Sequence, residues 1–329
     1  MSGAATTPSR RPVLPGRGAT ALRVVVSIAV TLFGLMALTF FIGRMLPLDP
    51  VAAILGDNAT QEAYEAMRAQ LGLDQPIWSQ YLGWLGHAVT GDLGSSWFTG
   101  QAVTTAISTR VTVTLSLVIG ATIISAIVAV VLGVWAAVRR GWADKLVQLV
   151  SILGFAIPGF LIALGLVTVF AINLRWFKPT GYVNLTDSFS GWIATVTLPI
   201  IALAIGGIAG VAQQVRGSVI DALRQDYVRT LRSRGLPANR IVFQHVLRNA
   251  GGPALAVLAV QFIGLLGGAV IVEQIFAIPG LGQVAVTATT QGDIPLVMGL
   301  VLITAIIVVI VNLLIDLLQG WLNPKVRLS

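Results

Sequence analysis

The sequence of 329 residues is 56% hydrophobic and only 10% charged, with a mean hydropathy of +0.87. Soluble domains usually carry roughly 25% charged residues, so this composition excludes a water-soluble globular protein and indicates a chain embedded in lipid. Cysteine is absent, which excludes disulfides and Cys-ligated metals. The two histidines, His87 and His245, lie too far apart to form a metal-binding motif.

Six apolar stretches are long enough to cross a bilayer, which takes about 20 helical residues. Their hydrophobicity is continuous rather than alternating, so the predicted fold class is an all-α polytopic membrane protein with six transmembrane helices. The first stretch exceeds the signal-peptide core of about 7–15 residues and no small-residue cleavage site follows it, which favours a retained anchor over a secretory signal. The predicted spans are residues 24–42, 111–138, 146–172, 192–215, 253–272 and 296–315.

The chain begins with a tail, residues 1–22, that is expected to lie in the cytoplasm. Residues 23–110 combine the first span with a long segment outside the membrane, in which 61–71 and 77–89 are expected to be helical. A structural collar on the helix bundle is the expected role of this segment, and a docking surface for an external partner is the alternative. The second of these helices has one apolar face, formed by Trp78, Tyr81, Leu82, Leu85 and Val89.

The other five spans lie in residues 111–318. Pro158 falls inside the third span, where a proline removes a helix hydrogen bond and predicts a kink that is either static or a hinge. Glu273 lies just past the fifth span, where an interfacial carboxylate is expected and a residue that lines a gate is the alternative. The small-x-x-x-small spacing of close helix contacts occurs twice, in Gly206 with Gly210 and in Gly264 with Gly268.

Residues 216–252 form an unusually long connection between two spans. Apolar residues recur every fourth position between Gly217 and Gly235, which predicts one amphipathic helix rather than an ordinary basic loop. Gly235 is expected to end that helix in the left-handed conformation, and Pro237 is expected in the first turn of a second helix. The recurring apolar residues are Val219, Leu223, Tyr227 and Leu231.

The Lys and Arg residues predict the orientation of the chain. With the N-terminus inside, 16 of the 21 fall in inner segments and 5 in outer segments. The positive-inside rule therefore places both termini in the cytoplasm, including the tail at residues 319–329, and residues 216–252 on the same side. The formal charge of +8 thus reports topology, and no nucleic-acid partner is expected.

The six predicted spans contain no Asp, Glu, Lys, Arg or His, whereas proton- and ion-coupled carriers generally place such groups inside the bilayer. The phosphate-binding sequence G-x-x-x-x-G-K-[ST] is also absent, as is H-E-x-x-H. These absences predict a non-catalytic conduit, with no catalytic residue, cofactor or metal, that a separate motor drives. The apolar face of the cytoplasmic helix would fill a cleft of that motor, and its arginines would pair at the rim.

Several motifs resemble those of the B-type subunit of dipeptide and oligopeptide permeases, which are binding-protein-dependent ABC importers. The resemblance covers about residues 22 to 328, although Leu231 is bulky and Pro237 stands where the family often has serine. The central motif is Asp226-Tyr227-Val228-Arg229-Thr230-Leu231-Arg232-Ser233-Arg234-Gly235-Leu236. The others are Leu71-Gly72-Leu73-Asp74-Gln75-Pro76, Gly91-Asp92-Leu93-Gly94-Ser95, His245-Val246-Leu247-Arg248-Asn249, Val272-Glu273-Gln274-Ile275-Phe276 and Pro279-Gly280-Leu281-Gly282.

The resemblance implies a type I ABC importer permease in the prokaryotic cytoplasmic (inner) membrane. It would pair with a C-type sister permease, two ATPase subunits that bind ATP and Mg, and an extracytoplasmic substrate-binding protein. A peptide is the expected substrate. A permease of this kind for nickel, opines or another small solute is one alternative, and an ion-coupled secondary transporter is another. Pro158 and Glu273 are the hinge or gate candidates, and the expected ATPase-coupling residues are Asp226, Tyr227, Val228, Arg229, Thr230, Leu231, Arg232, Gly235 and Leu236.

Overall fold

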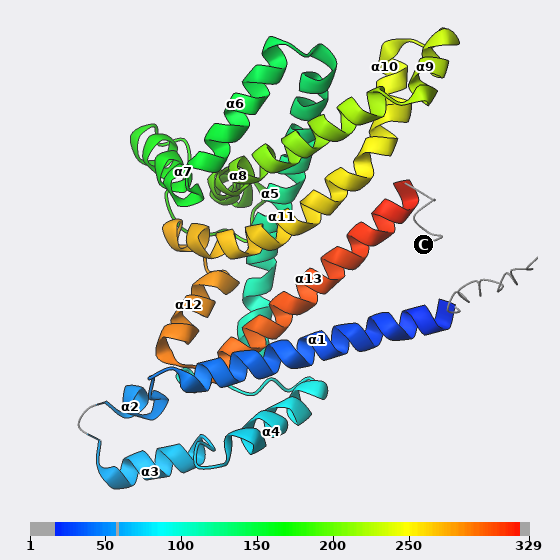
Figure 1. Cartoon of the computed structure of the whole chain (residues 1–329). Helices are drawn as coiled ribbons and strands as arrows, with labels where there is room; N and C mark the ends of the chain where they lie inside the picture. Colours follow the sequence, from blue (N-terminus) through cyan, green and yellow to red (C-terminus); the bar gives the residue numbers. More distant parts are fainter. Residues whose placement is uncertain (1–16, 57–58, 323–329) are drawn as a thin grey trace, which may run out of the picture.

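Helices make up the fold in the part of the chain that the computed structural model describes, residues 17–56 and 59–322, where the one strand-like contact joins Ser95 and Ala102. This confirms the all-α class. The predicted N-terminal tail lies outside the described residues up to residue 16, and its remainder belongs to the first helix. The long helices are α1 (Arg17–Met45), α5 (Val103–Arg139), α8 (Phe189–Leu223), α11 (Leu247–Ile275) and α13 (Ile294–Leu322) (Figure 1).

Five helices of the described part are long and apolar enough to cross a membrane, which confirms five of the six predicted spans. The helices extend past the apolar stretches. With 37 residues, α5 is about 55 Å long, whereas a hydrocarbon core is about 30 Å thick. It therefore reaches well beyond the membrane core.

The predicted third span is not one helix. It is divided into α6 (Trp142–Ala156) and α7 (Gly159–Leu166), which continues as the π-helix η1 (Val167–Asn173), and the two parts meet at 94°. Ile157 and Pro158 between them have extended backbone, with ψ of 118° and 135°. Proline disfavours helical conformation in the preceding residue and has no N–H to donate, which is consistent with the end of a helix at this point. The predicted bend at Pro158 is therefore confirmed in position, but it breaks the helix in two, and the two parts together count as a sixth, broken candidate span.

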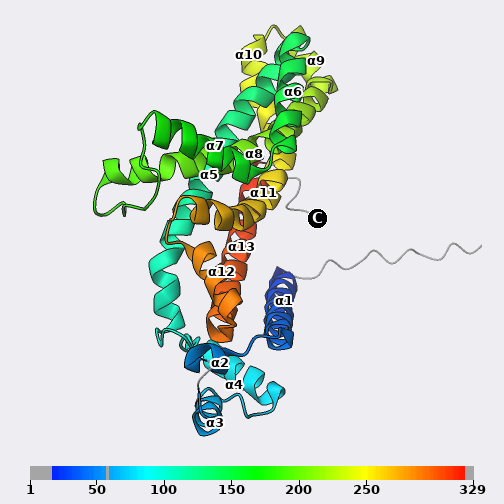
Figure 2. The same cartoon turned by 90° about the vertical axis from the view of Figure 1, so that its left-hand side faces the viewer.

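The two ends of the molecule are built from different elements (Figures 1 and 2). The turn between α5 and α6 lies at the upper end in both views, together with α9 (Asp226–Ser233) and α10 (Ala238–Arg240). The lower end holds α2 (Pro50–Leu55), α3 (Gln61–Gln70) and α4 (Ile77–Val89). The α5–α6 turn and α9–α10, which the basic residues assign to the inside, thus lie at the end opposite to α2–α4, which they assign to the outside.

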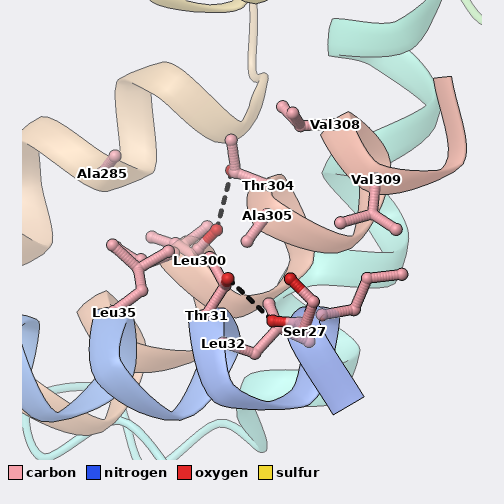
Figure 3. Close-up of a pocket in the computed structure, with 12 residues that line it drawn as sticks. Ser27, Thr31, Leu32, Leu35, Ala285, Leu300, Thr304, Ala305, Val308 and Val309 are labelled. Atoms are coloured by element: carbon pink, nitrogen blue, oxygen red, sulfur yellow. Dashed lines mark hydrogen bonds between the residues drawn. The ribbon is translucent and has the colours of Figure 1, made fainter. Parts of the chain in front are cut away.

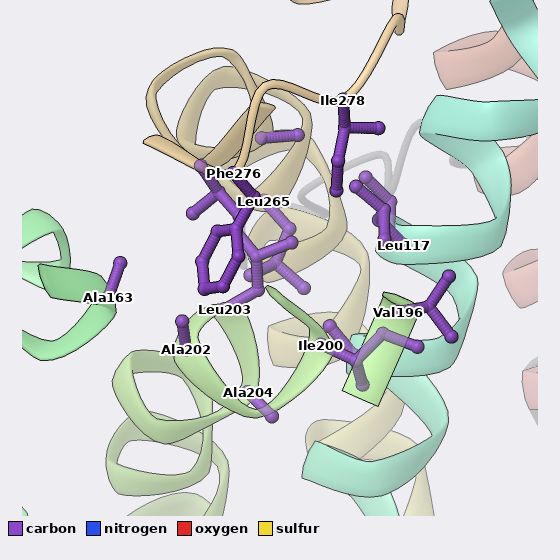
Figure 4. Packing of buried hydrophobic residues seen from close by; sticks show 14 of the residues in the cluster. Leu117, Ala163, Val196, Ile200, Ala202, Leu203, Ala204, Leu265, Phe276 and Ile278 are labelled. Atoms are coloured by element: carbon purple, nitrogen blue, oxygen red, sulfur yellow. The ribbon is translucent and has the colours of Figure 1, made fainter. Parts of the chain in front are cut away.

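The core is formed by α5, α8 and α11, which pack against one another. Leu117 of α5, Ile200 and Leu203 of α8 and Leu265 of α11 meet in one buried cluster, which Phe276 closes after the end of α11 (Figure 4). These three helices provide the frame on which the shorter elements are mounted.

α5 and α8 approach each other closely at Gly133. A Cβ atom at this position would lie 2.8 Å from the carbonyl oxygen of Ala212 and 2.8 Å from Cβ of Val215. In the two predicted pairs, a Cβ atom at Gly206 or Gly264 would meet nothing within 4 Å, whereas one at Gly210 would lie 3.5 Å from Phe155 and one at Gly268 would lie 3.5 Å from Leu203, which are ordinary contacts. Gly133 is therefore one of the small residues that let α5 and α8 pack closely, and the small-x-x-x-small spacing did not indicate it.

The outer segment is attached to α1 through α4. Tyr81 is 1% exposed, its hydroxyl donates to the carbonyl oxygen of Phe33 at 3.0 Å, and its ring packs against Phe40. Trp78 and Leu82, which were expected on the same apolar face, remain more than half exposed, so this chain covers only part of that face. The contact with α1 is what the collar interpretation expects.

Substituting Gly133 should test the close packing of α5 and α8. Because the added methyl group would meet backbone and a β-branched side chain, Gly133→Ala is expected to lower the free energy of unfolding by about 1–3 kcal/mol. Thermal unfolding of the purified protein in detergent measures this change. Gly206→Ala, on the same core helices but in open space, is the matched control, and equal unfolding midpoints for both variants would contradict the prediction.

Candidate functional site

The break between α8 and α9 forms one side of an elbow. α8 ends at Leu223, and Gln225 takes an extended conformation (φ −69°, ψ 149°) before α9 begins. The prediction of one amphipathic helix from Gly217 to Gly235 is therefore wrong, because its first part belongs to α8. The break lets Val228 of α9 join the same buried cluster as Val219 of α8.

The other side of the elbow is the turn at Gly235, which confirms the predicted helix end. Gly235 has a φ of +76°, a region that glycine enters without a steric penalty. Its N–H donates to the carbonyl of Arg232 at 2.9 Å, and the N–H of Leu236 donates to the carbonyl of Leu231 at 3.3 Å. This pair of hydrogen bonds is a Schellman motif, which satisfies carbonyl groups that the helix end would leave unpaired.

The helix after the elbow starts one residue later than predicted. Pro237 has extended backbone and precedes α10 as its N-cap, so it does not occupy the first turn. α10 continues through the π-helix η2 (Ile241–Val246) directly into α11. The elbow is thus connected to α11 by an unbroken run of helix.

α9 has one buried face and one exposed face. Val228 is fully buried, and Tyr227, Leu231 and Leu236 pack half-buried against a cluster formed by α5, α8, η2 and α11. This corrects the expectation that the apolar face enters a partner's cleft, because that face already packs inside the chain. The exposed face carries Asp226, Arg229, Thr230, Arg232, Ser233 and Arg234.

The exposed face offers charges of both signs to a partner. The side chains of Asp226 and Arg229 are 94% and 81% exposed and lie 3.4 Å apart. An ion pair at this level of exposure contributes little to stability, since water screens it. Both groups can therefore exchange this contact for one with another protein at low cost.

An ion pair that the sequence did not indicate connects α6 to α8 near the elbow. Arg216 binds Asp144 through two parallel hydrogen bonds, from Nε to Oδ1 and from Nη2 to Oδ2, the second at 2.8 Å. Both side chains are only about one-fifth exposed, at 23% and 21%. Such two-point arginine–carboxylate pairs fix orientation as well as distance. The sequence offered only one indication of this ion pair, which is that both residues fall in segments expected on the inner side of the membrane.

Glu273 lies in a second candidate region, where α11 leads into α12 (Leu281–Gln291). Its side chain is 0% exposed, so the carboxylate is buried among the helices and is not open to solvent. The carboxylate accepts a hydrogen bond from Oγ1 of Thr114 at 2.5 Å and one from the N–H of Gln283 at 3.1 Å. Thr114 in turn accepts from the N–H of Leu281 at 2.8 Å.

This network joins three helices through buried polar groups. The carboxylate of Glu273 lies at the N-terminus of α12, where a negative charge is favourable. Gly280 leaves the room for it, since a Cβ atom there would lie 2.2 Å from Oε1 of Glu273. Thr114 of α5 completes the joint.

A similar joint connects α13 to the outer segment. Asp293 is 1% exposed and accepts hydrogen bonds from Oγ of Ser96 at 2.5 Å and from the N–H of Trp97 at 3.3 Å. Asp293 directly precedes α13, so the start of this helix is tied to the loop before α5.

An apolar groove of 530 Å³ lies between α1 and α13, with α12 beside it (Figure 3). The hydroxyl groups of Thr31 and Thr304 turn back to the carbonyl groups of Ser27 and Leu300 in their own helices. No charged side chain of the described part lines the groove. It is therefore a surface for acyl chains or other helices and offers no ion-binding group.

The predicted site residues fall in three separate places. All nine predicted coupling residues lie on the elbow. Pro158 lies at the corner between α6 and α7, and Glu273 lies at the joint of α11 with α12.

Two family descriptions match the sequence. The family described as binding-protein-dependent transport system inner membrane component matches residues 129–328, and the description of the N-terminal part of such membrane components matches residues 20–118. The chain belongs to this family. The permease is 38% identical to a putative peptide transport system permease protein of Brucella abortus (strain 2308), over 94% of this chain and 97% of that protein.

Other relatives match the permease over almost their whole length. The oligopeptide transport system permease protein AppB of Bacillus subtilis (strain 168) is 35% identical over 93% of this chain and 98% of its own. The glutathione transport system permease protein GsiC of Escherichia coli O6:H1 is 35% identical over 90% of this chain and 95% of its own.

A solved structure shares the fold of the permease. A chain of the inward-facing MetNI methionine ABC transporter matches with a TM-score of 0.52 and 15% identity, over 66% of the permease and 96% of that chain. At this identity the likeness concerns the fold alone, which is the type I importer fold that the sequence predicted.

Substituting Thr114 should test the joint around Glu273. Thr114→Val removes the hydroxyl group that links Glu273 to Leu281, and each buried group left without a partner is expected to lower the free energy of unfolding by about 1–3 kcal/mol. Unfolding of the purified permease by SDS titration measures the change. Thr112→Val, on the exposed face of the same helix, is the matched control. If the Thr114 variant unfolded at the same SDS concentration as wild type, the hydrogen bonds around Glu273 would not contribute to stability and the prediction would be wrong.

Proposed function

We propose that this permease carries di- and oligopeptides across the prokaryotic cytoplasmic membrane as a non-catalytic subunit of an ATP-driven importer. The observation that carries the proposal is similarity, over 90% or more of the chain, to permeases named for peptide, oligopeptide and glutathione transport. Because glutathione is a tripeptide, the three named cargoes share one chemistry. Nickel, opines and other small solutes are outcomes that the substrate test below would distinguish.

The partners would be a C-type sister permease, two ATPase subunits and an extracytoplasmic binding protein. The sequence has no phosphate-binding loop, so a separate subunit must bind ATP and Mg. Large apolar side chains are exposed on α6, including Ile152 at 63% and Phe155 at 66%. This supports a permease whose helices are covered by lipid and by a second membrane subunit.

The elbow would couple the permease to the ATPase. In this proposal Asp226, Arg229, Thr230 and Arg232 contact the ATPase from the exposed face of α9. The other predicted coupling residues hold α9 in place: Tyr227, Val228, Leu231 and Leu236 pack it against the bundle, and Gly235 makes the turn. α9 packs against α8 and against η2, which leads into α11. A pull on the exposed face of α9 would therefore move the core helices α8 and α11 as a rigid body.

The elbow and both termini would lie in the cytoplasm, as the excess of Lys and Arg in those segments supports. Glu273 and Pro158 would help to form the hinge or gate of the translocation pathway. Glu273 would hold α12 against α5 and α11, and Pro158 would set the corner at which α7 leaves α6.

Reconstitution would test the proposed function. The permease in liposomes, together with its ATPase and sister subunits, should hydrolyse ATP faster when peptide-loaded binding protein is added, and unloaded binding protein should have a smaller effect. Loading the binding protein with nickel or an opine instead tests the alternative substrates. Uptake by the isolated permease that an uncoupler abolishes would overturn the proposal in favour of an ion-coupled carrier.

Gly235→Val should uncouple the transporter. A β-branched residue in the left-handed conformation is strained by roughly 1–2 kcal/mol or more, so the turn is expected to change shape. ATP hydrolysis should persist while peptide uptake is lost, and the amount of permease in the membrane should be unchanged. Gly235→Asn, which the left-handed conformation tolerates, should retain most uptake. A wild-type uptake rate in the valine variant would argue against the assigned turn.

Asp226→Arg should weaken binding of the ATPase, because it replaces an almost fully exposed negative charge on α9 with a positive one. We expect less ATPase to co-purify with tagged permease in detergent. Asp316→Arg, the same charge reversal at an exposed position on α13, should leave recovery unchanged. Equal recovery with both variants would exclude Asp226 from the interface.

A further inference from the structure

A polar pocket lies at the corner where α1 leads into α2 and α3. Its volume is 360 Å³, and its polar lining consists mainly of Arg44 from the last turn of α1, Asp49 before α2, and Tyr64 and Arg68 from α3. Pro47 and Pro50 form part of its wall. Because proline fixes φ, this part of the wall is rigid.

The one carboxylate among the pocket's lining residues is already engaged. Asp49 accepts hydrogen bonds from the hydroxyl of Tyr64 at 2.5 Å and from the N–H groups of Val51 and Ala52 at 2.9 and 3.2 Å. Burial alone would raise the pKa of Asp49, but the hydrogen bonds from Tyr64 and the two amides, together with the positive charge of Arg68, outweigh it and hold this pKa below its ordinary value. Asp49 is thus an ionised cap of α2, fixed in place by Tyr64.

The two guanidinium groups of the pocket have no close ion-pair partner in the described part of the chain, although Arg68 lies near enough to influence Asp49 and Tyr64 through its charge. No described acidic side chain lies within 4 Å of the guanidinium nitrogens of Arg44 or Arg68. Nε of Arg44 is shielded from solvent and has no hydrogen-bond partner among the described residues. A buried donor without a partner is costly, and the single carboxylate of Asp49 offsets only one of the two positive charges in the pocket.

We propose that Arg44 and Arg68 form an anion site that binds an acidic side chain of the extracytoplasmic binding protein. This inference rests on the proposed function. Guanidinium groups bind carboxylates through paired hydrogen bonds, which would supply the partner that Nε of Arg44 lacks.

The position of the pocket favours a protein partner over the transported peptide. α3 packs chiefly against α2, and none of its residues is buried. The helices α2 and α3 lie at the end of the molecule opposite to α9 and α10 (Figures 1 and 2). A carboxylate reaching this corner therefore comes from outside the bundle formed by α5, α8 and α11.

Titration of peptide-loaded binding protein against the reconstituted transporter tests the site. In the double variant Arg44→Gln, Arg68→Gln, the half-saturating concentration of binding protein for ATPase stimulation should rise about tenfold or more, as expected for loss of a desolvated charge pair. Stimulation at saturation should equal that of wild type. The dependence of the half-saturating concentration on KCl should also become shallower.

Lys178→Gln removes one positive charge from an exposed position in the expected outer loop between η1 and α8, and it should have little effect. Arg68→Gln alone, at an exposed position, keeps the test valid if the double variant fails to fold. An unchanged half-saturating concentration, or an equal rise with Lys178→Gln, would overturn the site.

C-terminally amidated peptides test the other source of a carboxylate. Suppose that the wild-type transporter imported amidated peptides as slowly as the double variant imports ordinary peptides, while the binding protein kept its affinity for the amidated peptides. The site would then bind the carboxylate of the substrate, and our proposal would be wrong. If binding protein did not stimulate even wild type, the proposed function would fail instead.

Discussion

Helices in lipid cannot be held together by the hydrophobic effect, because the acyl chains around them are as apolar as the helices themselves. Close contact and a few polar joints must do this instead. In the permease, Gly133 lets α5 approach α8, and three carboxylates fasten helix ends: Glu273 to Thr114, Asp293 to Ser96 and Asp144 to Arg216. Each joint connects segments that are far apart in the sequence, so together they set the arrangement of the bundle.

The same constraint explains how much of the fold could be predicted. Helix identity in a membrane follows from local hydrophobicity, and five spans were therefore found. The turn at Gly235 was also found, because its conformation depends on one residue and its neighbours. The right-angle corner at Pro158 was underestimated, since a proline alone does not reveal whether a helix bends or stops.

The candidate site was predicted less completely, because the burial of its residues depends on tertiary contacts between distant parts of the chain. All coupling residues were placed on one element, but the burial of Val228 depends on where α5 and η2 lie, which periodicity does not contain. The burial of Glu273 likewise depends on Thr114, more than 150 residues earlier, and on the room that Gly280 leaves. Whether a face points to a partner or into its own chain is decided by such distant contacts.

The corner at Pro158 has a consequence for the assembled transporter. Any helix end leaves carbonyl oxygens without intrahelical donors, and Pro158 brings no N–H of its own. Hydrocarbon tails cannot donate hydrogen bonds, so irregular backbone survives at membrane depth only where protein or water reaches it. Phe155 and Ile157 beside the corner are 66% and 45% exposed, so this chain leaves the spot open. A corner at membrane depth therefore requires shelter from a neighbouring subunit or from a hydrated passage.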